Sequence, residues 1–119
     1  MPMHASPEIL FLHLPRSDAL EAAIQRRIEH LRQYGEDLHA ISVAVEPVQR
    51  HAHRGRPYEV RIDLILNGQE LVANRSRHED VYVALRDAFD GITRQLEDAV
   101  RRRRAGPQHR DTVRRAMPS

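Results

Sequence analysis

The sequence predicts an α+β fold, a two-layer β-α-β-β-β-α domain in which two helices cover one face of a four-stranded sheet. Three observations support this prediction. Segments 38–47, 58–66 and 69–74 alternate apolar and polar residues, as strands with one buried face do. Segments 18–34 and 76–104 each carry a single apolar stripe at helical spacing. The chain of 119 residues is long enough for one modest core and too short for two.

The chain opens with a predicted strand and a predicted helix. Residues 8–14, "EILFLHL", are apolar on both faces and stop at Pro15, so we expect a strand covered on at least one side. Ser17 is suited to cap the helix that follows. The apolar stripe of this helix recurs at steps of four, four and three residues, as Leu20, Ile24, Ile28 and Leu31. The helix is expected to end near Gly35, because glycine readily adopts the left-handed cap conformation.

Three further strands follow from residue 38. In the first, Ile41, Val43 and Val45 share one side, and Pro47 ends the pattern. The strand at 58–66 shows the clearest alternation in the chain. Asn67-Gly68 then predicts a type I′ hairpin turn, because both residues tolerate positive φ. In the return strand 69–74, Leu71 and Ala73 are expected to point inward.

The second helix is predicted from a capping box at its start and a long apolar stripe. Ser76 and Glu79 have the spacing of a capping box, in which each side chain satisfies a free backbone N–H. The stripe consists of Val81, Leu85, Ala88, Ile92, Leu96 and Ala99, widened by Tyr82, Phe89 and Val100. After Gly106-Pro107 the periodicity ends. We therefore expect one domain over residues 1–104 and a basic, disordered tail over 105–119.

Several classes of function are disfavoured by composition. The chain contains no cysteine, which excludes disulfides, thiolate metal sites and cysteine nucleophiles. It has five glycines and no glycine-rich phosphate-binding pattern, and its serines lack the context of a catalytic nucleophile. His51 and His53 could point the same way on an extended chain, but two histidines among arginines do not make a metal site. No segment approaches the length of a membrane span or resembles a secretion signal. We therefore expect a cytoplasmic protein that is not an enzyme, with no cofactor, bound metal or small-molecule substrate.

Positive charge is concentrated at the end of the chain. Residues 1–100 hold 12 arginines and 16 acidic residues, a net charge of −4, whereas residues 101–119 hold seven arginines and one acidic residue, a net charge of +6. Arg101 to Arg104 cover every direction around a helix axis, so this turn has no side to bury in a core. The run either contacts a polyanion such as RNA or is a frayed, solubilising tail.

The second helix also resembles one protein family. Its "DVYVALRDAFDGITRQL" resembles the Asp-x-Tyr-x-Ala-[apolar]-Asp pattern, followed by a basic residue, Gln and Leu, of ribosome hibernation-promoting factors, also called ribosome-associated inhibitors or sigma modulation proteins, with the second Asp one position later here. The residues that carry the resemblance are Asp80, Tyr82, Ala84, Asp87, Asp90, Arg94, Gln95 and Leu96. "HLRQYGEDL" and "LNGQELVA" resemble the stretches before the second strand and around the hairpin of the family. The resemblance spans about residues 8–104 and is to the short form, without the second, dimerising domain of long members.

This resemblance implies a protein that docks on the small ribosomal subunit and its ribosomal RNA, in the channel of messenger RNA and tRNA, and blocks translation. The expected phosphate-contacting residues are all arginines: Arg27, Arg86, Arg94, Arg101, Arg102, Arg103 and Arg104, with Arg75, Arg77, Arg54 and Arg56 as weaker candidates. Glu97 and Asp98 precede the arginine run where short members tend to be basic, which predicts a smaller or displaced contact surface. No membrane partner is expected, and a monomer is favoured.

Two alternatives remain open from the sequence. The predicted architecture is like that of double-stranded-RNA-binding domains, so a general RNA-binding module is one of them. The other is a protein-interaction domain that has this fold without ribosome binding, in line with the net negative charge of residues 1–100.

Overall fold

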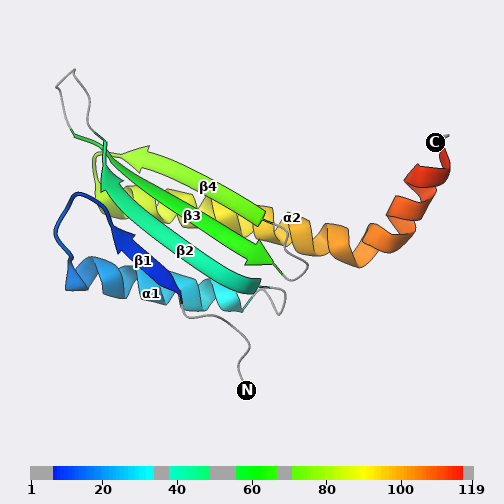
Figure 1. Cartoon of the computed structure of the whole chain (residues 1–119), viewed down its shortest axis with the longest axis horizontal. Coiled ribbons are helices and arrows are strands. Elements are labelled where there is room, and N and C mark those ends of the chain that lie inside the picture. The colour runs from blue at the N-terminus through cyan, green and yellow to red at the C-terminus, as the bar shows by residue number, and fades with distance from the viewer. Residues whose placement is uncertain (1–6, 34–37, 49–55, 67–70, 117–119) are drawn as a thin grey trace.

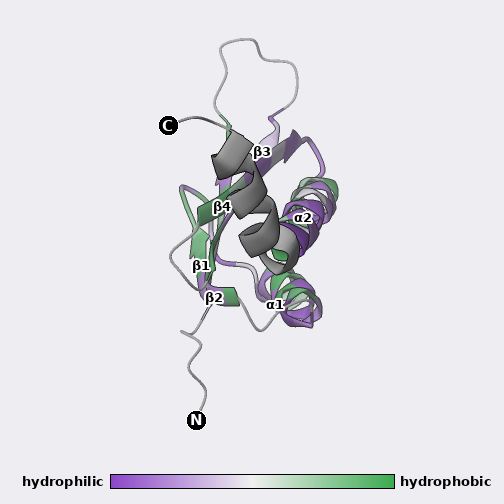
Figure 2. Cartoon of the chain, turned by 90° about the vertical axis from the view of Figure 1, so that its right-hand side faces the viewer, coloured by the Kyte–Doolittle hydropathy of each residue, from purple (hydrophilic) through white to green (hydrophobic). Residues whose placement is uncertain are grey.

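A computed structural model describes the backbone of residues 7–33, 38–48, 56–66 and 71–116, and side chains as far as residue 102. Within these residues the elements are β1 (Glu8–Phe11), α1 (Asp18–Arg32), β2 (Leu38–Pro47), β3 (Tyr58–Leu66), β4 (Leu71–His78) and α2 (Val81–Ala116). The strands form one sheet in the order β1-β2-β3-β4 (Figure 1). Both helices lie on the same side of this sheet (Figure 2). The predicted α+β class and element order are thus confirmed.

The sheet is mixed, and the pairing of its strands sets the position of α1. β1 runs parallel to β2, whereas β2, β3 and β4 are successively antiparallel. Parallel neighbours cannot be joined by a tight turn, so the chain crosses over one face of the sheet through α1. α2 packs mainly on β4 and β3. The two helices therefore lie side by side over the sheet, and the candidate site lies between them.

One aliphatic core fills the space between the sheet and the helices. The predicted stripe of α1 is buried, with Ile24 fully enclosed and Leu20, Ile28 and Leu31 no more than 3% exposed. The inward rows of β2 and β3 are buried as predicted: Ile41, Val43, Val45, Val60, Ile62, Leu64 and Leu66. From α2 come Ala84, Leu85, Ala88, Phe89, Ile92, Leu96 and Ala99. No charged or polar side chain is buried among the described residues.

The predicted start of α1 is confirmed, and β1 is shorter than predicted. The Ser17 side-chain oxygen accepts a hydrogen bond from the backbone N–H of Leu20 at 3.2 Å, as an N-cap does. β1 ends at Phe11, although the Leu12 N–H still donates to the carbonyl of Val45 at 2.8 Å. His13 then adopts a φ of 60°, a left-handed conformation that turns the chain away from the sheet. Gly35, the predicted helix stop, lies outside the described residues.

β4 corrects two predictions about the return strand. It continues to His78, four residues beyond the predicted end at 74, because its pairing with β3 continues to Tyr58. Val72 pairs with Leu64 and is the buried residue, whereas Leu71 is 63% exposed and Ala73 also faces solvent. The prediction that Leu71 and Ala73 point inward was wrong, because residues paired across two strands lie on the same face of the sheet. The predicted turn at Asn67-Gly68 lies outside the described residues.

The start of α2 also differs from the prediction. Ser76 and Glu79 do not form a capping box, since Ser76 lies within β4 and the helix begins at Val81. Asp80 is the N-cap instead. Its carboxylate accepts from the Tyr82 N–H at 2.9 Å, and its carbonyl accepts from the N–H groups of Val83 and Ala84 at 3.0 Å. Pairing with β3 therefore outweighs the local capping signal.

α2 extends further along the chain than the sequence suggests. Its backbone remains helical to Ala116, whereas a disordered tail was expected from residue 105. The expected end of the helix rested on Gly106 and Pro107, because a proline inside a helix removes a backbone hydrogen bond and costs about 3 kcal/mol. The domain boundary at 104 and the disorder of the basic tail over 105–119 stay predictions. Among the described residues, no helix combines the length with the apolar content that crossing a bilayer requires.

Candidate nucleic-acid interface

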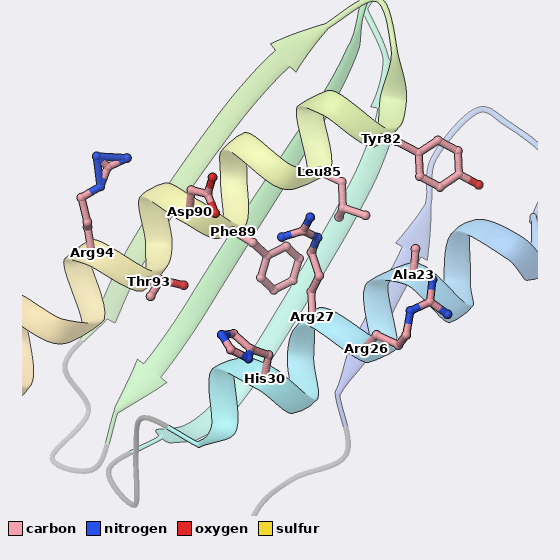
Figure 3. Close-up of a pocket in the computed structure, with 10 residues that line it drawn as sticks. All are labelled: Ala23, Arg26, Arg27, His30, Tyr82, Leu85, Phe89, Asp90, Thr93 and Arg94. Atoms are coloured by element: carbon pink, nitrogen blue, oxygen red, sulfur yellow. The ribbon is translucent and has the colours of Figure 1, made fainter.

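A groove runs between α1 and α2 on the surface that faces away from the sheet (Figure 3). Its volume is about 770 Å³, within the roughly 300–1,000 Å³ usual for ligand sites. The floor is apolar, with Ala23 of α1 and Leu85 and Phe89 of α2. The remaining lining side chains are polar or carry a polar group: Arg26, Arg27, His30, Tyr82, Asp90, Thr93 and Arg94. The groove is therefore apolar beneath and mainly cationic at its walls.

The helical repeat of α1 places three basic side chains in this groove. Ile24 and Ile28 hold the helix to the core. Around the helix axis, Arg27 lies about 300° beyond Ile24, and His30 lies about 200° beyond Ile28. Arg26 and His30 are four residues apart and therefore lie one turn above the other. Arg26 and His30 are exposed, whereas Arg27 is partly buried and points between the helices toward Phe89 (Figure 3).

α2 forms the opposite wall of the groove. Leu85 and Phe89 belong to its buried stripe and are 1% and 3% exposed, so only their edges reach the groove floor. Asp90 and Arg94, again four residues apart, are both exposed. Tyr82 lies at one end of the groove, and Arg94 lies farther along α2 (Figure 3). Asp90 is the one acidic residue among those that line the groove.

Ion pairing separates six described arginines from Arg26, Arg27, Arg32, Arg56 and Arg94, of which Arg32 and Arg56 do not line the groove. The six pair with an acidic residue: Arg16 with Glu21 (2.6 Å), Arg61 with Asp63 (3.2 Å), Arg75 and Arg77 with Glu59 (3.8 and 2.8 Å), Arg86 with Asp87 (3.3 Å) and Arg101 with Asp98 (3.3 Å). Arg26, Arg27 and Arg94 form no ion pair with any residue that the structure describes. All three line the groove. Their positive charge is thus available to an anionic partner.

The structure brings two of the predicted contact residues together and separates others. Arg27 and Arg94 line the same groove from opposite helices. Arg86 is exposed on α2, paired with Asp87, and is not among the lining residues. Arg101 and Arg102 are exposed farther along α2. Arg103 and Arg104 continue that helix, but their side chains lie outside the described part.

The weaker candidates lie away from the helices. Arg75 and Arg77 belong to β4 rather than to a connection before α2. They alternate with the inward Val72 and Asn74, so they point to the outer face of the sheet, where Glu59 partly neutralises both. Arg56 is exposed just before β3, and Arg54 lies outside the described residues. A surface that fits the groove between α1 and α2 therefore does not also cover Arg75 and Arg77.

Sequence reasoning did not select three residues of the groove, namely Arg26, His30 and Tyr82. The i, i+4 spacing of Arg26 and His30 is a signal that could have identified them as neighbours of Arg27. Tyr82 was assigned to the edge of the apolar stripe, yet it is 47% exposed. Within the described part of the chain, no cluster of three or more histidine and acidic side chains is suited to a metal ion. His51 and His53 lie outside that part.

Comparison with known proteins places these features in a family. The sequence pattern of the family described as "Sigma 54 modulation protein / S30EA ribosomal protein" matches residues 8–104. The fold is similar to that of the Protein Y N-terminal domain from Thermus thermophilus, with a TM-score of 0.58 and 21% identity over 76% of this chain and 93% of that chain. It is also similar to a ribosomal subunit interface protein from Coxiella burnetii, with a TM-score of 0.66 and 11% identity over 77% of this chain and 93% of that chain. No curated protein matches the sequence.

Proposed function

The chain belongs to the sigma 54 modulation protein / S30EA ribosomal protein family of ribosome-associated modulation proteins, and from this membership we propose that it is a ribosome hibernation factor. In this proposal it binds the small ribosomal subunit, in the channel that messenger RNA and the anticodon ends of tRNA occupy. Translation stops because the channel is filled, so no catalytic step is needed. The site of action is the cytoplasm.

The observation that carries this proposal is the set of arginines without an ion pair in the groove between α1 and α2. A guanidinium that already pairs with a carboxylate must lose that partner before it binds phosphate, whereas Arg26, Arg27 and Arg94 have none to lose among the described residues. The planar fork of arginine donates two parallel hydrogen bonds to a phosphate. Ribosomal RNA supplies phosphates at closely spaced positions, which suits cations on two neighbouring helices.

Rigid positioning supports the same function. Both walls of the groove are helices whose opposite faces are held in the core by fully or almost fully buried residues, Ile24 and Ile28 on α1 and Ile92 on α2. Arginines on such helices are presented at fixed separations, so less conformational freedom is lost on binding. Shape and phosphate contacts are sufficient for a protein that occupies a channel, and sequence-specific reading of base edges is not required.

Co-sedimentation with purified small and large ribosomal subunits, at low and moderate salt, tests the proposal. We expect comigration with the small subunit. The double variant Arg27→Gln/Arg94→Gln should bind more weakly and lower the log–log salt slope by about 0.7–0.9 for each phosphate that the variant no longer neutralises, the range for single- and double-stranded nucleic acid. A cell-free translation reaction should be inhibited by the wild-type protein and much less by this variant.

The matched control is Arg16→Gln/Arg61→Gln, which removes the same formal charge from two exposed, ion-paired arginines that do not line the groove. It should bind subunits as the wild type does. Tight binding to plain duplex RNA without comigration with subunits would replace the proposal with a general RNA-binding module. Binding to neither would favour a protein-interaction domain.

A further inference from the structure

Tyr82 is the one strongly exposed aromatic side chain in the described part of the chain, at 47% of its surface. The two phenylalanines, Phe11 and Phe89, are partly or almost fully buried in the core, and Tyr58 is partly buried at the start of β3. The backbone of Tyr82 is held in place, because the carboxylate of Asp80 accepts a hydrogen bond from the Tyr82 N–H at 2.9 Å. An aromatic ring is thus presented to solvent from a fixed point at the beginning of α2.

The surroundings of this ring differ from those of an isolated surface tyrosine. It stands at the end of the groove where Ala23 and Arg26 of α1 form the facing wall (Figure 3). Alanine keeps that wall low and leaves room above it. Arg26 lies three residues after Ala23, on the same side of α1, and forms no ion pair with a described residue. An apolar ring and a free, planar guanidinium therefore flank one end of the space between the helices.

A groove that bound only phosphates would not require an exposed aromatic ring at its end. In duplex RNA the bases are stacked on one another, and their flat faces are not available to a protein side chain. An unpaired base has two exposed faces, which stack on aromatic rings and on guanidinium planes. A tyrosine beside an arginine, with further arginines along the same groove, is the combination that an unpaired nucleotide with its flanking phosphates fits.

We propose that the Tyr82 end of the groove binds one unpaired nucleotide of an RNA strand, with its base stacked on Tyr82 and flanked by Arg26. The adjoining phosphates lie along Arg27 and the opposite wall. The assignment of that strand to ribosomal RNA rests on the proposed function, whereas preference for an unpaired base over duplex is a separate property. A small nucleotide would fill one end of the groove and leave Arg94 without a phosphate, so a chain of several nucleotides is the expected ligand.

Fluorescence titration with an eight-nucleotide single-stranded RNA that carries 2-aminopurine at its centre tests this inference. Stacking on Tyr82 should change the emission of the probe on binding. Tyr82→Ala should lower the affinity by roughly 5- to 150-fold, the range for loss of one base–aromatic stack, and leave the salt slope unchanged. Tyr82→Phe keeps the ring and should bind within about twofold of the wild type. Arg26→Gln should instead reduce the salt slope by about 0.7, the value for one phosphate on a single strand.

Two further arms identify the ligand. A 16-base-pair RNA duplex should bind wild type and Tyr82→Ala equally, and adenosine 5′-monophosphate at the concentration of the oligonucleotide should not displace the probe. Equal affinity of Tyr82→Ala and wild type for the single-stranded probe would overturn the inference. Displacement by the monophosphate at equal concentration would overturn the assignment to an RNA strand. Thermal melting of each variant verifies that it is folded.

Small-subunit binding separates this inference from the function on which it rests. If the wild type comigrates with small subunits, Tyr82→Ala should comigrate more weakly, and Tyr82→Phe should comigrate as the wild type does. Equal comigration of all three proteins would overturn the stacking role of Tyr82. If the wild type does not bind subunits at all, the proposed function fails. The fluorescence titration then still decides whether the groove takes an unpaired nucleotide.

Discussion

Individual arginine side chains differ in the charge that they offer to a partner, although they are identical in the sequence. Glu59 neutralises Arg77 and, at a longer distance, Arg75, on the outer face of the sheet. Arg27 and Arg94 keep their charge in the groove between the helices. Exposed ion pairs contribute little to stability, up to about 1 kcal/mol each. Their main consequence here is for the charge pattern, since the arginines of the groove have no ion pair with a described residue whereas those on the outer face of the sheet do.

Gly91 and Asn74 form a close contact between α2 and β4. A Cβ atom added at Gly91 would lie 2.6 Å from the side-chain nitrogen of Asn74, and that nitrogen donates a hydrogen bond to Gln95 at 3.0 Å. Gly91 therefore lets α2 approach the sheet at the point where the polar side chains Asn74 and Gln95 meet. Gln95 belongs to the motif that carries the family resemblance, and this contact supplies a structural reason for a glutamine at that position.

We predict that Gly91→Ala and Asn74→Ala are not additive. Alanine in a helix is favoured over glycine by about 1 kcal/mol, but in the wild type it would force Asn74 from its rotamer, at about 0.5–1.5 kcal/mol, and break a hydrogen bond worth about 0.5–1.5 kcal/mol. Gly91→Ala should therefore be neutral to destabilising alone and stabilising in the Asn74→Ala background. Urea unfolding of the four proteins measures the coupling. Additivity within about 0.5 kcal/mol would contradict this account.

In β4, sequence periodicity is not sufficient to predict which residues face the core and which face solvent. Leu71 and Val72 are adjacent and both apolar, so the alternation in this segment is compatible with either phase. The phase was decided by pairing, because Val72 lies opposite the buried Leu64 and Leu71 lies opposite the exposed Ile65. In β3 the charged Glu59, Arg61 and Asp63 separate the apolar residues and fix the phase, and Val60, Ile62, Leu64 and Leu66 are buried as predicted.

Among the secondary-structure elements, α2 has the most complex beginning. The residues that precede it contain two capping signals, Ser76 with Glu79 and Asp80 by itself. β4 uses Ser76 in its pairing with Val60, which removes it from any helix. Asp80 follows the last strand residue by two positions and is left to cap the helix, with the N–H of Asp80 donating to the His78 ring nitrogen at 2.9 Å. The length of one element thus determined the start of the next.

The identity of this cap can be checked by substitution. Asp80→Ala should lower the free energy of unfolding by about 0.5–2 kcal/mol, the usual cost of losing an N-cap. Asp80→Asn keeps an acceptor oxygen at the same position and should cost less. Chemical denaturation of both variants, with Glu79→Ala as the comparison, measures the difference. A larger loss for Glu79→Ala than for Asp80→Ala would restore the capping box that the sequence predicted.

At the scale of the whole molecule, the helix side of the domain and the outer face of the sheet carry different surfaces. The side formed by the helices holds the cationic groove, and the outer face of the sheet holds charges of both signs together with the exposed Ile65 and Leu71. Arginines on the free edge strand β4 also disfavour pairing with another strand edge, since like charges would meet. Beyond the sheet, α2 continues as a projecting helix (Figure 1).

Truncation separates the contribution of this projection from that of the groove. Ending the chain after Val100 removes Arg101 to Arg104 but keeps Ala99 and Val100, which contact the core. The free energy of unfolding should change by less than about 0.5–1 kcal/mol, since the pair of Arg101 with Asp98 is highly exposed. Affinity for the small subunit should fall, and the salt slope should decrease by about 0.7–0.9 for each phosphate that the shortened chain no longer neutralises.

A chain that ends after Arg104 is the matched control and should keep its affinity if the four arginines bind the phosphates. Equal affinity of both truncated proteins and the wild type would identify the run as a solubilising tail. The ion pair between Arg101 and Asp98 indicates which arginine of the run should contribute least. It also agrees with the expectation that Glu97 and Asp98 reduce the contact surface at this junction.

Local patterns in the sequence were sufficient for the element order, the fold class, the buried stripes of α1 and α2 and the family. The reason is that helical and strand periods translate directly into which side chains face the core, whatever the rest of the chain does. Three features required the tertiary structure: the phase of β4, the cap of α2 and the grouping of Arg26, Arg27, Tyr82 and Arg94 around one groove. Each depends on a partner distant in the sequence, and spacing along one segment contains no information about how α1 is placed against α2. Which arginines share that groove, and hence where the proposed RNA strand would find positive charge, was decided by that packing.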